Sequence, residues 1–362
     1  MRERLLELVD RLESIAAAQI GRLPAPLQVA LTGGRKTIRD GQALAPDVQL
    51  ILFLRRLLRG PELSELPPAA SRERLRREAR LHGGRLAEVG GISERVIEGP
   101  AGPLRARHYA PDAKGTEPLL VYFHGGGYVV GDLETHDAAC RLICQKARVH
   151  VLAVDYRLAP ESPFPAALDD GRAALRWAFA HAQELGCDPA RIAVGGDSAG
   201  GNLAAVVSQR AAHDGGPAPA AQLLIYPALD RSHPHASLGA FADGFLLTRA
   251  DIDWYQLQYA GPHADLFDPR ISPLRAKDLS GLPPALIITA GFDPLRDEGE
   301  AYARALTDAG SRAELHRFAG LVHGFVNMLG PSPSARLAVA EIAVRLRALL
   351  DGLAEKRSGG RA

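Results

Sequence analysis

Cysteine is scarce in this chain of 362 residues, which contains three: Cys140, Cys144 and Cys187. The odd number and the absence of a C-x-x-C pair argue against a disulfide framework, and a reducing compartment is the simpler reading. Cys140 and Cys144 are spaced as neighbours on a helix, so we expect core thiols and no metal site.

Long apolar runs and an excess of charge of one sign are also missing. No segment approaches the roughly 18 apolar residues of a membrane span, and the charged start Met1–Arg4 does not resemble a signal peptide. The 43 basic and 42 acidic residues give a net charge of +1, which indicates neither nucleic acid nor an anionic membrane as partner. We therefore expect a soluble cytoplasmic protein without stable membrane insertion.

Residues 1–90 have helical patterning and no strand patterning. An apolar stripe recurs at helical spacing at Leu5, Leu6, Val9, Leu12, Ile15 and Ala16, and a second runs through Gln49–Leu58. A third helix, Ser71–Leu81, is rich in Arg and Glu, and we expect it to present a solvated face. The mixed charge of the first stripe's polar face favours packing onto the protein over a membrane anchor.

From Ile92 onward, short apolar strands alternate with helices. A hairpin of Ser93–Glu98 and Leu104–Tyr109 comes first, and the later expected strands are Leu119–Phe123, His150–Asp155, Ile192–Val194, Gln222–Tyr226, Leu286–Thr289 and Ala313–Phe318. This alternation predicts an α/β fold whose mainly parallel sheet is covered by helices on both faces. Residues 228–275 interrupt it, and an insertion there would lie at the carboxyl ends of the strands, where such sheets bind ligands.

Ile192–Asn202, I-A-V-G-G-D-S-A-G-G-N, reads as a strand, a sharp turn and a helix. It contains G-x-S-x-G, the pattern of a nucleophile elbow, with Ser198 at the apex between Gly196 and Gly200. Larger side chains at the two glycines would collide with the neighbouring strand or helix. A Gly-rich turn without catalytic function is the alternative for this pentapeptide alone.

A serine nucleophile needs donors for the developing oxyanion. His124-Gly125-Gly126-Gly127 follows an apolar strand, and this H-G-G-G pattern is typical of the oxyanion loop of lipases and esterases. We expect donors among the backbone N–H groups of these glycines, with the N–H of Ala199, next to Ser198, as the third. His124 is expected to hold the loop rather than to transfer protons.

An acid and a base follow two later strands. Asp293 lies in the loop just past Leu286–Thr289, and we prefer it to Asp297 and Glu298, which begin the next helix. His323 lies in a Gly-flanked loop past Ala313–Phe318. The order Ser198, Asp293, His323 is that of an α/β-hydrolase triad.

These motifs resemble the hormone-sensitive-lipase-like α/β-hydrolases, the bacterial family IV carboxylesterases. The residues that carry the resemblance are His124–Tyr128 with Gly131 and Asp132, Asp155–Glu161, Gly196–Gly200 including Asp197, Asp293–Glu298 and His323–Phe325. The resemblance implies an eight-stranded, mostly parallel sheet with a helical cap. It divides the chain into a helical extension and cap (1–90), a first core part (91–227), a cap insertion (228–275) and a second core part (276–362). It also implies oxyanion donors at Gly126, Gly127 and Ala199, and that the Asp155–Glu161 charges brace a turn near the site.

The implied activity is hydrolysis of short- to medium-chain acyl esters through an acyl-enzyme, with a small-molecule ester as the partner and no cofactor. Amide hydrolysis on the same scaffold, or a ligand receptor without catalysis, are the alternatives, and a homodimer is left open. Four side chains are candidates for the substrate pocket, although each could equally be core: Tyr128, Phe245, Leu246 and Phe325.

Overall fold

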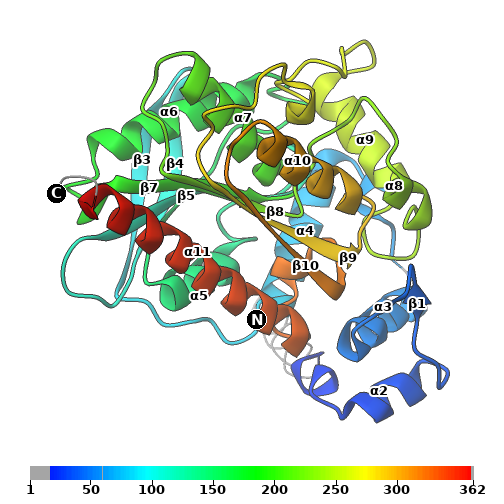
Figure 1. Cartoon of the computed structure of the whole chain (residues 1–362). Coiled ribbons are helices and arrows are strands. Elements are labelled where there is room, and N and C mark those ends of the chain that lie inside the picture. The colour runs from blue at the N-terminus through cyan, green and yellow to red at the C-terminus, as the bar shows by residue number, and fades with distance from the viewer. Residues whose placement is uncertain (1–16, 59, 360–362) are drawn as a thin grey trace, which may run out of the picture.

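An eight-stranded sheet lies at the centre of the computed structural model, which describes residues 17–58 and 60–359 (Figure 1). The strands are β3 Gly91–Gly99, β4 Gly102–Ala110, β5 Glu117–Phe123, β6 His150–Val154, β7 Cys187–Asp197, β8 Ala221–Ile225, β9 Ala285–Phe292 and β10 Ala313–Val322. Their order is β10-β9-β8-β7-β5-β6-β4-β3. The strands from β10 to β6 pair in parallel, and the hairpin β3–β4 joins β6 antiparallel. The predicted fold class and the edge hairpin are confirmed.

Helices cover both faces of this sheet. In Figure 1, α5 and α11 lie on one side, and α6, α7 and α10 lie on the other. Their bounds are α5 Asp137–Ala147, α6 Ala166–Ala180, α7 Ala199–His213, α10 Arg296–Asp308 and α11 Pro333–Gly359. Two apolar cores result, one between the sheet and each helix layer.

The central strand β5 shows why the chain folds this way. All seven of its residues are buried. Leu120 and Tyr122 pack into the core that contains α5 and α11, whereas Val121 and Phe123 pack into the core that contains α6 and α7. Since side chains alternate across a strand, a continuous apolar run fills both layers and holds the strand's carboxyl end in a fixed position.

The N-terminal segment contains α2 Ala25–Leu31, β1 Ile38–Arg39, β2 Gln42–Ala43, α3 Pro46–Leu58, η1 Leu63–Glu65 and α4 Pro68–His82. The expectation that residues 1–90 hold no strand is wrong, because β1 and β2 form a small hairpin. Its turn, Asp40-Gly41, has φ values of 49° and 70°, as a tight two-residue hairpin turn requires. The apolar stripe predicted between Leu5 and Ala16 lies outside the described residues.

Residues 228–275 contain α8 Ala236–Ala240, α9 Arg249–Ala260 and η2 Pro273–Arg275. This insertion contacts the N-terminal segment, because Ser64 Oγ donates to Asp251 Oδ1 at 2.6 Å and Arg56 Nη2 donates to the Gly244 carbonyl at 3.1 Å. The four-part division of the chain stays a prediction. Within residues 17–58 and 60–359, we find no helix with the length and apolar character needed to cross a bilayer.

Candidate active site

Ser198 sits between the end of β7 and the start of α7, with φ 54° and ψ −118°. A non-glycine residue at positive φ is strained, and such strain persists only where the surroundings hold it. Here the Ser198 N–H donates to the Ile225 carbonyl of β8 at 2.9 Å. A Cβ added at Gly200 would overlap the carbonyl oxygens of Phe123 and His124, and one at Gly196 would overlap that of Phe123. The tight approach of strand and helix at this turn therefore requires both glycines.

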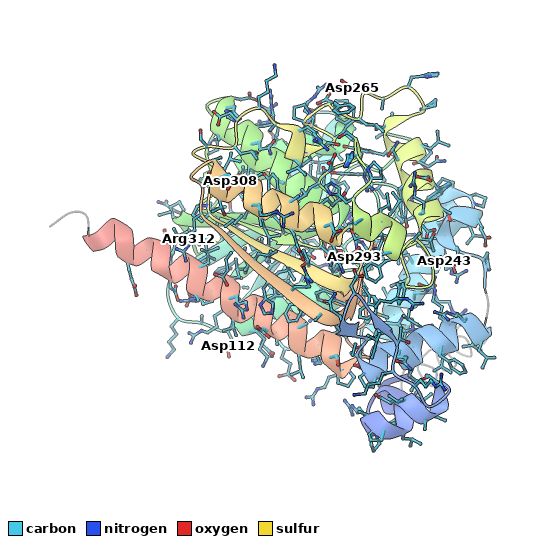
Figure 2. The ribbon with its side chains drawn as sticks, turned by 45° about the vertical axis from the view of Figure 1, so that its right-hand side comes forward. Asp112, Asp243, Asp265, Asp293, Asp308 and Arg312 are labelled. Atoms are coloured by element: carbon cyan, nitrogen blue, oxygen red, sulfur yellow. The ribbon has the colours of Figure 1, made fainter. Side chains whose placement is uncertain are left out.

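The three side chains proposed as a triad lie in one chain of hydrogen bonds. His323 Nε2 is 2.9 Å from Ser198 Oγ, and His323 Nδ1 is 2.8 Å from Asp293 Oδ2. Asp293 is fully buried, and its other oxygen accepts the N–H of Leu295 at 2.8 Å. Figure 2 shows Asp293 at one end of the edge strands and Arg312 at the other. A carboxylate, an imidazole and a hydroxyl in this order are arranged for nucleophilic catalysis.

The two alternative acids have other contacts. Asp297 accepts hydrogen bonds from Arg296 Nε and from the Ser237 N–H. Glu298 is buried and accepts the N–H of Leu229 at 2.8 Å. Burial raises the pKa of Glu298 to about 8. Both stand in the first turn of α10, where the helix dipole favours acidic residues.

The H-G-G-G loop is fixed from its carbonyl side. His124 Nδ1 lies 2.8 Å from the Gly125 carbonyl, and since a carbonyl only accepts, Nδ1 carries the proton. Tyr156 Oη donates to the carbonyl of His124 at 2.7 Å. Burial, followed by the neighbouring His136, lowers the pKa of His124 to about 4. This histidine is therefore neutral at pH 7 and has the geometry of a loop anchor.

The expected oxyanion donors, Gly126, Gly127 and Ala199, share one arrangement. In the described part of the chain, no hydrogen bond uses their backbone N–H groups. Each of these N–H groups shares a peptide unit with the carbonyl of the preceding residue, and that carbonyl accepts a hydrogen bond. His124 binds the Gly125 carbonyl, the N–H groups of Val129 and Val130 donate to the Gly126 carbonyl at 3.0 Å, and those of Asn202 and Ala228 donate to the Ser198 carbonyl at 3.0 and 3.2 Å. Because a trans peptide points its C=O and N–H in opposite directions, each free N–H has a fixed direction.

The carboxylate of Asp197 links the elbow to the glycine loop. Its Oδ1 accepts from the Gly125 N–H at 2.9 Å and from Tyr122 Oη at 2.8 Å, and it lies 3.3 Å from His136 Nε2. Burial alone would raise the pKa of Asp197, but His136 and the donated hydrogen bonds outweigh burial and hold the pKa below its ordinary value. Asp197 thus stays ionised beside the proposed nucleophile.

Two tyrosines at the site were not among the sequence-derived candidates. The ring of Tyr226 lies 4.5 Å from that of His323, and its hydroxyl donates to Asp197 Oδ2 at 3.3 Å. Tyr255 of α9 lies over the glycine loop, because a Cβ added at Gly127 would overlap its ring. The position of Tyr226 directly after a strand was a usable signal. Nothing in the local sequence connects Tyr255 with Gly127.

The four pocket candidates have diverse surroundings. Tyr128 is buried, stacks on Tyr259 and donates to Asn202 Oδ1 at 2.6 Å. Phe245 and Phe325 are buried in the core on the α5 and α11 side, and Leu246 packs against that core. Their assignment to a substrate pocket stays a prediction.

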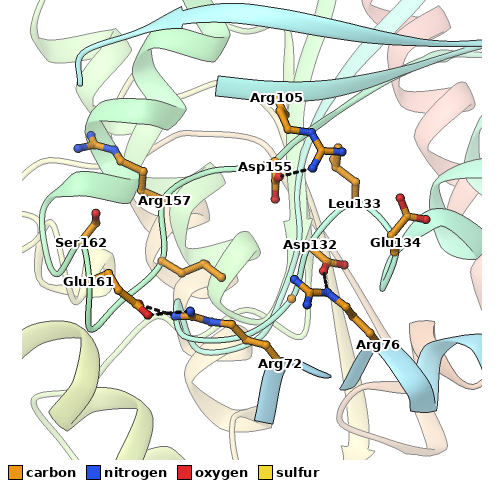
Figure 3. Close-up of a pocket in the computed structure, with 12 residues that line it drawn as sticks. Arg72, Arg76, Arg105, Asp132, Leu133, Glu134, Asp155, Arg157, Glu161 and Ser162 are labelled. Carbon is orange, nitrogen blue, oxygen red and sulfur yellow. Dashed lines mark hydrogen bonds and ion pairs between the residues drawn. The ribbon is translucent and has the colours of Figure 1, made fainter. Parts of the chain in front are cut away.

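A cavity of about 560 Å³ lies beside residues 131–134, which follow the glycine loop, and none of the three triad candidates lines it (Figure 3). Its charged lining consists of Arg72, Arg76, Arg105, Arg157, Asp132, Glu134, Asp155 and Glu161. The Asp155–Glu161 charges are paired, for example Asp155 with Arg105 at 3.8 Å and Glu161 with Arg72 at 2.6 Å.

Among the described residues, three buried groups lie close enough to hold a metal ion: His108, His150 and Cys187, with ligand atoms within 4.8 Å of one another. The imidazoles are bonded to each other, since His108 Nε2 lies 2.9 Å from His150 Nδ1. Cys187 begins β7 and Ser198 follows its end. The cluster therefore lies at the amino end of this strand, and the candidate active site lies at its carboxyl end.

Known proteins resemble this chain over most of its length. Residues 120–327 match a family described as alpha/beta hydrolase fold. The carboxylic ester hydrolase LipN of Mycobacterium tuberculosis is 48% identical over 335 residues, covering 91% of this chain and 89% of that protein. An ethyl acetate hydrolase of Pseudomonas putida is 46% identical over 58% of this chain and 66% of its own. The solved ester hydrolase EH1AB1 from the Lake Arreo metagenome, complexed with a bipyridine phosphonate derivative, is 44% identical with a TM-score of 0.82, covering 84% of this chain and 98% of that chain.

Proposed function

Because this chain belongs to the alpha/beta hydrolase family, in its hormone-sensitive-lipase-like group, and is a carboxylic ester hydrolase, we propose that it hydrolyses short- to medium-chain acyl esters through Ser198. His323 acts as general base and then general acid, and Asp293 orients it. The observation that carries this proposal is the pair of hydrogen bonds Ser198–His323 at 2.9 Å and His323–Asp293 at 2.8 Å.

In the first step, Ser198 Oγ attacks the ester carbonyl while His323 Nε2 takes the hydroxyl proton. Asp293 accepts the Nδ1–H of His323, which keeps the imidazole in the required tautomer and stabilises its charged form. The carbonyl oxygen becomes an oxyanion that the N–H groups of Gly126, Gly127 and Ala199 bind. One such donor is typically worth about 3–4 kcal/mol of transition-state stabilisation. Collapse of the intermediate gives the acyl-enzyme, and His323 donates its proton to the leaving alcohol.

In the second step, water replaces the alcohol. His323 Nε2 removes a proton from the water as its oxygen attacks the acyl carbon, and the same three N–H groups bind the second oxyanion. The acid leaves, and the proton returns from His323 to Ser198 Oγ. The protons of the cycle balance, and His323 transfers each of them.

A short acyl chain is supported by two observations. One relative is named an ethyl acetate hydrolase. In this chain, the ring of Tyr255 closes over Gly127, and α9 contacts the N-terminal segment through Asp251 and Ser64. A covered glycine loop restricts the space beside the oxyanion, which disfavours long chains.

The test is hydrolysis of p-nitrophenyl esters from acetate to palmitate by the wild type and by Ser198→Ala, His323→Ala and Asp293→Asn. Because triad residues act as a unit, we expect each of the first two changes to lower kcat by about 10⁴-fold or more, and their combination to cost little beyond either alone. Ser280→Ala, at an exposed serine, is the matched control with wild-type rates.

Additive losses in the double variant would contradict a shared proton relay. A phosphonate should also attach covalently to Ser198 in the wild type, detected by mass spectrometry of the peptide that contains it. An unmodified Ser198 in an active enzyme would assign the nucleophile elsewhere. The rate maximum should fall at short to medium chains, and a maximum at palmitate would refute the size assignment.

A further inference from the structure

Arg72 of α4 is not part of a solvated face, contrary to the expectation for the Arg- and Glu-rich helix. Its side chain is only 18% exposed. Nε donates to the carbonyl of Val129 at 2.8 Å, Nη2 donates to the carbonyl of Ala159 at 2.8 Å, and Nη1 and Nη2 donate to the Glu161 carboxylate at 2.9 and 2.6 Å. The planar guanidinium fork thus fixes three partners at once, which a point charge could not do.

The bond to Val129 leads back to the proposed oxyanion site through two peptide units. The carbonyl of Val129 and the N–H of Val130 belong to one planar unit, and that N–H donates to the Gly126 carbonyl at 3.0 Å. The carbonyl of Gly126 and the N–H of Gly127 form the next unit. The hydrogen bonds therefore run in one direction, from the Arg72 guanidinium through two peptides to the N–H of Gly127.

Such an alignment has two consequences. First, the position of Arg72 sets the direction of the Gly127 N–H, because each peptide is rigid and anchored at its carbonyl. Second, a cation at the start of a hydrogen-bonded chain polarises each unit in turn, which strengthens the last donor. Gly127 has φ 61°, a conformation that glycine adopts without strain, so the direction of its N–H depends on the hydrogen bonds at the neighbouring carbonyls.

The remaining contacts hold Arg72 itself in place. Ala159 and Glu161 lie in the loop that follows β6, and Glu161 lines the charged cavity (Figure 3). One turn along α4, Arg76 bonds to Asp132, which follows the glycine loop. Helix α4 thus bonds to the chain after the H-G-G-G motif at two points, Val129 and Asp132. Glu161 is 61% exposed, so water screens its charge and leaves part of the guanidinium field directed at the peptides.

We propose that Arg72 is a positioning residue for ester hydrolysis, which aligns and polarises the Gly127 N–H through the peptides of Val129 and Gly126. The N-terminal segment then contributes to transition-state stabilisation as well as covering the site. This proposal rests on the function proposed above, and it concerns kcat, since the oxyanion exists only in the transition state and the intermediates.

The experiment compares Arg72→Ala, Arg72→Lys and the matched control Arg80→Ala. Arg80 lies on the same helix, is 55% exposed and pairs with Glu73 at 3.6 Å. Steady-state kinetics with p-nitrophenyl butyrate are recorded well below the Tm of every variant. Since a misplacement of 1 Å far from the reacting atoms can cost about 10²-fold, we expect kcat of Arg72→Ala to fall about tenfold to a hundredfold, with KM changed by less than about threefold.

Chemical rescue separates alignment from general stability. Guanidinium at low millimolar concentration should restore part of kcat in Arg72→Ala and none in Arg80→Ala, and urea at the same concentration should restore nothing. Arg72→Lys keeps the charge and the aliphatic stem but loses the fork, so its kcat should fall by about tenfold. It decides the matter if Arg72→Ala does not fold.

A kcat of Arg72→Ala or Arg72→Lys within about twofold of Arg80→Ala, or a loss confined to KM, overturns the proposal. A loss of kcat that guanidinium does not relieve in a folded Arg72→Ala also overturns it. The two proposals fail separately. An unreactive Ser198 in the wild type removes the proposed function, whereas an unaffected Arg72 variant removes only the role of Arg72.

Discussion

At the scale of single residues, this site holds a strained backbone conformation and a buried charge. Ser198 keeps a positive φ, and Asp197 keeps its charge while buried. Each is held by several fixed neighbours, and local strain persists only where it is overdetermined in this way. The hydrogen bond from Ile225 and the tight glycine contacts provide this for Ser198.

Glu298 gives a prediction at this scale. Because burial raises its pKa to about 8, the folded protein retains a proton that the unfolded chain releases near its ordinary pKa of about 4.5. Between these two values the folded state binds more protons, so the free energy of unfolding should fall as the pH rises. Glu298→Gln mimics the protonated acid and should flatten this dependence.

Urea unfolding of the wild type and Glu298→Gln, followed over pH 4.5 to 8, measures the effect. The control is Glu98→Gln, at an exposed position on β3, which should keep the wild-type slope. Parallel stability curves for all three proteins would show that Glu298 titrates normally in the folded state.

At the scale of elements, the strand, turn and helix of the elbow work only because the backbone of β5 approaches α7 very closely. A Cβ added at Gly200 would overlap two carbonyl oxygens, and a backbone cannot rotate away as a side chain can. The same contact holds Ser198 beside the glycine loop. Stability and the proposed catalysis therefore both require that residue 200 has no side chain.

Gly200→Ala should consequently lower the free energy of unfolding by about 1–3 kcal/mol, the usual cost of overpacking, and should lower kcat as well. The matched change is Gly352→Ala on α11, where an added Cβ meets nothing within 4 Å. Removing a helical glycine there should stabilise the protein by about 0.5–1 kcal/mol. Chemical denaturation measures both, and opposite signs are the expected result. A neutral Gly200→Ala would mean that α7 can shift.

At the scale of the whole molecule, the N-terminal segment is joined to the second half of the chain by polar contacts. Asp47, at the start of α3, is buried and accepts hydrogen bonds from Ser332 Oγ, Ser334 N and Ser334 Oγ at 2.7–2.9 Å. The carboxylate thus lies beside the N-terminus of α11, where the helix dipole favours negative charge.

Asp47→Ala should therefore destabilise the protein by about 3 kcal/mol, because hydrogen bonds to a charge contribute about 1.5–3 kcal/mol and two serine hydroxyls lose their acceptor. Asp112→Ala, at an exposed carboxylate that Figure 2 labels, is the control. Urea unfolding midpoints and m-values give the comparison. A difference between the two variants below about 0.5 kcal/mol would exclude Asp47 as a major docking contact.

The fold could be predicted from the sequence to a large extent. Short apolar runs such as Leu119–Phe123 are typical of buried strands, and their alternation with helices leaves few topologies. Boundaries were less predictable. β7 extends over Cys187–Asp197 and β10 reaches Val322, beyond the predicted Ile192–Val194 and Ala313–Phe318, because pairing with neighbouring strands prolongs them past their apolar cores. The hairpin β1–β2 was missed because two-residue strands carry no periodicity.

For the site, the sequence by itself determined the candidates whose chemistry is local: Ser198 between its glycines, the H-G-G-G loop, and Asp293 and His323 after their strands. A short motif that follows a strand can be placed from sequence, because the carboxyl ends of parallel strands lie at the same side of the sheet. Only the tertiary structure decided which distant groups support them. Arg72 reaches Val129 across 57 residues of chain, and Tyr255 reaches Gly127 from α9. Packing between elements, which no local pattern encodes, brings them there.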